Sequence, residues 1–191
     1  MSNDTQYWMA RYDVVRYVGI HHAPPPPMPE EILAAGRLKQ RWPRRYHWTI
    51  DESPGREFPD FPFSFGGELI MSPRACEVLL PMIEPWVWLE RDVEIDTDRG
   101  YVAAVLTEEY DCFDEQKSRG TRGTVSGAWL EVQDLTLRAR KIEAAPIFRL
   151  PTRTIQWRPI LSAPIAHAIA THGLTGLALQ PADVLPYSTG R

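Results

Sequence analysis

The chain has 191 residues, which is enough for one domain with a substantial core, and its hydrophobic fraction of 43% argues against disorder. No apolar run reaches the roughly 18 residues that a membrane-spanning helix needs. The first residues lack a basic region followed by an apolar run, so we expect no secretory signal and a cytoplasmic location. Cys76 and Cys112 are too few for a disulfide framework or a zinc site, and we expect them to be reduced and buried.

The N-terminal part, residues 1–67, is rich in strand formers and proline. Residues 7–12 (YWMARY) are aromatic and β-favouring and predict a first strand, which could continue toward residue 18. The run APPPPMP at 23–29 cannot donate ladder hydrogen bonds and predicts an extended connector. A short helix at 30–38, a strand at 44–50 and an irregular stretch at 51–62 are expected to follow.

The C-terminal part alternates strands and helices. Residues 68–71 predict a strand, and Ser72-Pro73 predicts a helix start, with serine as the N-cap and proline in the first turn. That helix is expected to end at about residue 80. Residues 116–127 are polar and glycine-rich and predict a loop. Strands are expected at 129–137 and 147–150, a second helix at 163–171, and a short strand or turn after His172-Gly173.

The closing segment echoes the earlier one at an offset of 90, since Ser162 matches Ser72 and Ile169 matches Leu79. Both segments have the order apolar strand, serine cap, helix, strand. This pattern fits either an internal duplication or the shared rules of helix capping. In both cases it predicts a single α+β domain over residues 1–191, with a few short helices packed on a mixed, mostly antiparallel sheet.

The most unusual stretch lies between Glu84 and Glu115. Eleven acids stand there against two arginines, a local charge of −9, so the rest of the chain carries +5. Acids occupy alternate positions from residue 90 to residue 98, with apolar side chains between them, which predicts one strand with an acidic face. Residues 96–100 predict a hairpin turn and residues 101–106 the returning strand.

This acidic row has several interpretations. Acids on the wet face of a strand can simply keep the strand soluble and prevent its edge from pairing with other chains. The density of oxygens at Glu94, Asp96 and Asp98 is calcium-like, but the stretch lacks the order of an EF-hand loop, and we assign no metal there. Because a row of like charges adds no stability, an external field that attracts a cationic partner is the functional interpretation.

Motifs that announce catalysis are absent from the sequence: there is no GxSxG, HExxH, P-loop, GxGxxG or CxxC pattern. We therefore assign no catalytic residue and expect no cofactor. A small hydrolase that uses Asp111 or Asp114 with His47 or His167 stays open as an alternative. The basic regions lack the pattern of an RNA-recognition module or a zinc finger, so direct nucleic-acid binding is not expected.

Four segments carry a resemblance to a known family: ELIMSPRACEVLL, YVAAVLTEEYDCFDEQKS, IFRL and ILSAPIAHAIATHGLTGLALQP. In order and spacing, over residues 68–181, they resemble the bacterial immunity-protein-eleven family. Membership implies a protein encoded beside a secreted polymorphic toxin, of the kind used in bacterial competition, which it binds and neutralises. The resembling segments consist of caps, strands and turns, and they carry over no catalytic residue.

Charge and resemblance together predict an immunity protein that covers the basic active domain of a toxin, such as a nuclease that acts in the cytoplasm. A third alternative is a self-associating structural protein, although we do not predict an oligomer. The residues predicted to bind the partner are Trp86, Trp88, Glu90, Asp92, Glu94, Asp96, Asp98, Glu108, Glu109 and Asp111.

Overall fold

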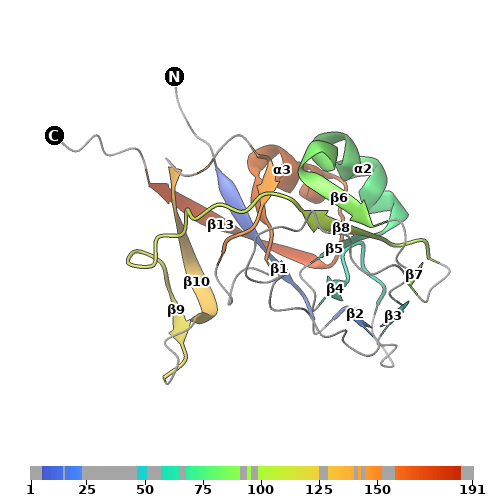
Figure 1. The fold of residues 1–191 in the computed structure, drawn as a ribbon, viewed down its shortest axis with the longest axis horizontal. Coiled ribbons are helices and arrows are strands. Elements are labelled where there is room, and N and C mark those ends of the chain that lie inside the picture. Colours follow the sequence, from blue (N-terminus) through green and yellow to red (C-terminus); the bar gives the residue numbers. More distant parts are fainter. Residues whose placement is uncertain are drawn as a thin grey trace.

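Two strand–helix–strand units with the same topology form the centre of the fold in the computed structural model (Figure 1). The structure describes residues 6–14, 16–22, 47–50, 57–64, 68–90, 94–95, 99–124, 129–139, 142, 145–151 and 158–185. The predicted proline-rich connector at 23–29 and the predicted helix at 30–38 lie outside these residues.

The first unit consists of β5 (Leu69–Met71), α2 (Pro73–Ile83) and β6 (Val87–Glu90), with the short 3₁₀ helix η1 (Glu84–Trp86) leading into β6. Both strands pair antiparallel with β8 (Val102–Leu106), which lies between them. The second unit consists of β12 (Ile160–Ser162), α3 (Ala163–Thr171) and β13 (Leu177–Leu185) around β1 (Tyr7–Tyr12). The offset of 90 in the sequence therefore corresponds to a repeated topology.

The strands are arranged in three sheets. The largest has the order β11-β12-β1-β13-β10-β9, and it is completed by β9 (Arg119–Arg122), β10 (Trp129–Arg138) and β11 (Ile147–Phe148). The second has the order β4-β2-β3-β7 and contains β2 (Gly19–His22), β3 (His47–Ile50), β4 (Phe63–Ser64) and β7 (Glu94–Ile95). The third is β5-β8-β6. The predicted mixed, mostly antiparallel α+β fold is confirmed, with three sheets in place of one.

Both helices begin where the sequence predicts. The Ser72 hydroxyl accepts a hydrogen bond from the Ala75 backbone N–H at 3.1 Å, so the predicted cap is confirmed. Ser162 holds the same position before α3, but its hydroxyl makes no capping bond. The first helix continues past its predicted end to Ile83, through Pro81, because burial of Leu79 and Ile83 on one face stabilises its last turn.

Two clusters of buried apolar residues form the core. One lies where α2 and α3 pack side by side against the sheets (Figure 1), and it includes Leu79, Ile165, Ala104 and Leu161. The other lies on the opposite face of the largest sheet, around Met9 and residues of β10 and β11. Of the two free cysteines, Cys112 is buried as predicted and Cys76 is half-buried.

The loop predicted at 116–127 is wrong in part, because β9 pairs antiparallel with β10 there. A Cβ atom on Gly120 would lie 2.0 Å from the Glu131 carbonyl oxygen, so glycine permits the close approach of the two strands. In the sequence Gly120 indicates a loop, but in the fold it allows β9 to pair with β10. No helix within the described residues has the length and apolar character needed to cross a membrane.

Candidate functional site

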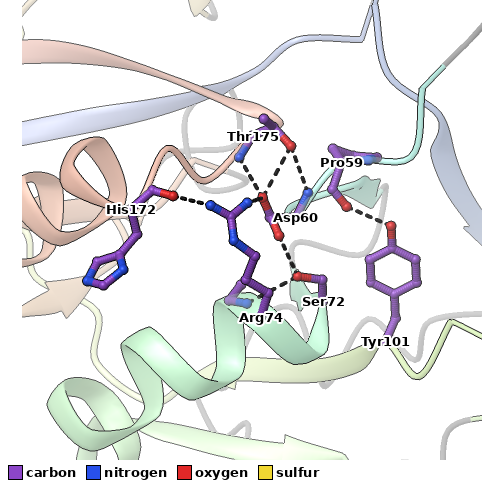
Figure 2. A network of polar contacts seen from close by, with 8 residues as sticks. Pro59, Asp60, Ser72, Arg74, Tyr101, His172 and Thr175 are labelled. Carbon is purple, nitrogen blue, oxygen red and sulfur yellow. Dashed lines mark hydrogen bonds and ion pairs between the residues drawn. The ribbon is translucent and has the colours of Figure 1, made fainter.

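A buried carboxylate, that of Asp60, joins the two units (Figure 2). Asp60 is 7% exposed and lies in the loop before β4. Its carboxylate accepts hydrogen bonds from the Ser72 hydroxyl at 2.7 Å and from the Thr175 backbone N–H at 2.9 Å. The Arg74 guanidinium lies 3.2 Å away on the same carboxylate. One side chain therefore connects the start of α2 to the turn that follows α3.

Backbone contacts hold the same loop in place. Phe61 N–H donates to the Thr175 carbonyl oxygen at 3.0 Å, and the Tyr101 hydroxyl donates to the Pro59 carbonyl oxygen at 2.6 Å. Burial and the neighbouring Asp60 charge raise the pKa of Tyr101 to about 12, against the opposing charge of Arg99. Sequence patterns do not predict this network, because its members come from four separate segments: residues 59–61, 72–74, 101 and 172–175.

Serine, aspartate and histidine meet in this region, as they do in hydrolases, but the geometry is structural. The Ser72 hydroxyl is engaged by Asp60 and by the Ala75 N–H. His172 takes part through its backbone carbonyl, which accepts from Arg74, and its imidazole points away from Asp60 in Figure 2. No imidazole in this network is placed to take a proton from Ser72, as nucleophilic catalysis requires.

Asp114, one of the two carboxylates nominated for hydrolysis, also has a structural role. It is 8% exposed, accepts from the backbone N–H groups of Gln116 and Lys117, and lies 3.3 Å from the Arg138 guanidinium. Burial alone raises the pKa of Asp114, but these hydrogen bonds and the Arg138 charge outweigh it and lower the pKa. Its predicted partner His167 is exposed and contacts Thr171. For His47 the structure describes the backbone and not the side chain.

Three of the five acids between residues 108 and 115 form ion pairs with the protein's own arginines. Glu109 pairs with Arg149 at 3.0 Å, and Glu115 pairs with Arg122 at 3.2 Å. Asp111 is exposed and has an interaction of its own. Within the described residues, no group of three or more histidines, cysteines or carboxylates could hold a metal ion.

The continuous acidic strand is wrong as predicted, because it is divided between two sheets. Glu90 is the last residue of β6, opposite Ala103 of β8. Glu94 belongs to β7 and pairs with His47 of β3 in a parallel arrangement. The two segments lie in different sheets because β6 pairs with β8, whereas β7 pairs with β3. The predicted contacts Asp92, Asp96 and Asp98, and the predicted turn up to residue 98, lie outside the described residues.

The two tryptophans nominated as anchors differ in environment. Trp86 is half-buried and packs against both core clusters, so it is a core residue. Trp88 is 55% exposed, although Val105, opposite it on β8, is 5% exposed. An exposed indole forgoes the stabilisation that burial would give, and aromatic side chains are enriched at protein contact surfaces.

The hydrogen-bond pattern decides which backbone groups of β6 face outward. Thr107 N–H donates to the Trp86 carbonyl oxygen at 3.1 Å, in the register that pairs Trp88 with Val105. In an antiparallel ladder, hydrogen-bonded and non-hydrogen-bonded pairs alternate. Trp88 and Glu90 therefore direct their N–H and C=O groups to β8, whereas the N–H and C=O of Leu89 point to the other edge. In the described part of the chain, no strand pairs with that edge.

Two acids lie close in sequence to the end of the ladder at which Val87 pairs with Leu106. Glu84 is the first residue of η1, which leads into β6, and it is exposed. Glu108 follows β8 and is contacted by two hydroxyl groups, those of Thr107 at 3.3 Å and Tyr110 at 3.4 Å. No ion pair to either carboxylate occurs within the described residues. We name Trp88, Glu84, Glu108 and the outer edge of β6 the β6 surface.

The sequence matches no protein-family model, and it matches no curated protein. The resemblance to the immunity-protein-eleven family therefore stays a prediction, which depends on the segments quoted for it.

Replacement of Asp60 by alanine is expected to destabilise the protein by about 2 kcal/mol, because the Thr175 N–H and the Ser72 hydroxyl lose a buried acceptor. For a chain of this length the melting temperature should fall by about 4–8 °C in a thermal unfolding scan. Arg74→Ala is the matched control. The Arg74 side chain is 55% exposed, so its loss should cost below about 1 kcal/mol. Equal losses for the two variants would contradict a central role for Asp60.

Amide hydrogen exchange should distinguish the two sides of β6. We expect the Leu89 N–H to exchange at least about tenfold faster than the N–H groups of Trp88 and Glu90, which are bonded to β8. Residue-resolved exchange by NMR measures this difference, with the neighbouring residues as internal controls. A slow Leu89 amide would mean that another segment of the chain covers this edge.

Proposed function

We propose that this protein is an immunity-type inhibitor that binds a cognate bacterial toxin through the β6 surface. The observation that carries the proposal is the 55% exposure of Trp88 on a strand whose outer edge pairs with no other strand of the described chain. Solvent-exposed tryptophans are enriched among the residues that dominate binding energy at protein interfaces. The family resemblance of residues 68–181 supports the same class of protein.

Charge indicates the kind of partner. Glu84 and Glu108 lack ion-pair partners within the described residues, whereas Glu109, Asp114 and Glu115 are paired with arginines. A cationic surface is the complement of the unpaired acids, and a nuclease domain is cationic where it binds phosphates. Complementary charge also speeds association, which an inhibitor of a lethal enzyme requires. The proposed toxin is therefore a basic nuclease domain that acts in the cytoplasm.

The alternatives have less support. A hydrolase that uses Asp114 must release that carboxylate from Arg138 and from two backbone N–H groups. Self-association through opposite charges would need the arginines and acids that already pair within one chain, such as Arg149 with Glu109. Binding through the β6 surface needs no such rearrangement.

The test uses the C-terminal domain of the secreted protein encoded beside this chain's gene, purified as an inactive variant. Replacement of Trp88 by alanine should weaken its binding about 30-fold or more, as loss of an interface hot spot does. Charge reversal of Glu84 and Glu108 to lysine should slow association and reduce its salt dependence. Surface plasmon resonance at several salt concentrations measures both effects.

Leu130→Ala is the matched control, because Leu130 is an apolar residue of β10 with 63% exposure. It should leave binding unchanged. If the toxin domain does not bind the unmodified protein, the proposed function is wrong. If it binds Trp88→Ala and the double reversal normally, the contact lies elsewhere.

A further inference from the structure

The outer edge of β6 has the chemistry of a strand-docking site. The Leu89 N–H and C=O point outward, and by the same alternation the Val87 C=O does so too. A residue of an incoming parallel strand can donate to the Val87 oxygen and accept from the Leu89 nitrogen. Exposed edges of this kind are used by proteins that bind extended peptides through strand addition.

The chain itself provides an example of this arrangement. In the second unit, the strand that corresponds to β6 is β13, and β10 pairs with it in parallel on the edge away from β1. The equivalent edge in the first unit is the one away from β8. Beyond β6, β7 pairs in parallel with β3. Within the described residues, residues 87–90 pair with β8 alone, whereas the corresponding strand β13 has a parallel strand on its other edge.

We infer that the β6 edge captures an extended, cationic segment of the partner as an added parallel strand. This inference rests on the proposed function and specifies how the partner is held. The segment is cationic because Glu84 and Glu108 flank the end of the ladder where Val87 pairs with Leu106, and neither has an ion-pair partner within the described residues. It carries lysine or arginine at alternate positions, because side chains on one face of a strand recur every second residue.

Trp88 supplies the anchor. Its indole is 55% exposed beside the edge, and a lysine or arginine of the added strand can lie over its face as a cation–π contact. Such contacts already occur within this chain, where the guanidinium carbon of Arg122 lies 4.0 Å from the centroid of the Trp129 ring. A ladder of three backbone groups is short, so affinity depends on Trp88 and the acids, whereas register depends on Leu89.

The test separates the backbone N–H of residue 89 from its side chain. Leu89→Ala and Leu89→Pro both remove the half-buried leucine side chain, but only the proline variant also removes the outward N–H. An edge position tolerates proline, since this N–H makes no bond to β8. Binding of the toxin domain is expected to be about tenfold weaker for Leu89→Pro than for Leu89→Ala. Thermal unfolding of both variants verifies that the fold is kept.

A peptide probe tests the same edge without altering the protein. The ¹⁵N-labelled protein is titrated with a short peptide of alternating lysine and valine, and with a second peptide in which glutamate replaces lysine. We expect the lysine peptide to shift the amide signal of Leu89 and the indole signal of Trp88 and to slow exchange at Leu89. The glutamate peptide, and a lysine peptide N-methylated along its backbone, should do neither.

Equal affinity of the two Leu89 variants, or peptide shifts confined to other parts of the protein, would overturn strand addition. If Trp88→Ala still weakens toxin binding in that case, the proposed function stands with another mode of contact. Absence of any complex with the toxin domain would instead remove the proposed function itself. Should Leu89→Pro fail to fold, the N-methylated peptide decides the question.

Discussion

The position of β8 between β5 and β6 is the constraint on which the proposed β6 surface depends. An interior strand uses its backbone groups alternately on its two sides, so pairing with β5 and β6 fixes which groups of each neighbour face inward. The register of Trp88 opposite Val105 then places the polar backbone groups of Leu89 at the outer edge. The availability of this edge follows from hydrogen-bond geometry and not from a particular side chain.

The Asp60 carboxylate has the corresponding role for the helices. A buried carboxylate is tolerated when its oxygens are satisfied, and those of Asp60 receive donors from Ser72, Arg74 and Thr175. Because Ser72 also caps α2, the start of that helix and the turn after α3 share one anchor. The Asp60 carboxylate therefore joins the two units where α2 begins and where the turn after α3 lies.

The distribution of charge along the sequence differs from the distribution of unpaired charge in the fold. Eleven acids between Glu84 and Glu115 indicate a broad negative surface when counted along the chain. In three dimensions, arginines from distant segments reach several of them, such as Arg149 at Glu109 and Arg138 at Asp114. Within the described residues, Glu84 and Glu108 have no such ion pair. Local composition does not predict an ion pair between distant segments, because the pair forms only where the fold makes those segments neighbours.

The sequence by itself determined the local elements: the serine cap and proline of α2, the stop of α3 at Gly173, most strands, and the α+β class. These depend on a few adjacent residues, which is why they could be predicted. Only the tertiary structure decided that the acidic row is split between β6 and β7, that Trp86 is half-buried in the core while Trp88 is exposed, and that residues 119–122 form a strand. Each of these outcomes depends on pairing between segments far apart in the chain. The free energy of such pairing is set by both segments, so the sequence of one segment alone does not predict it.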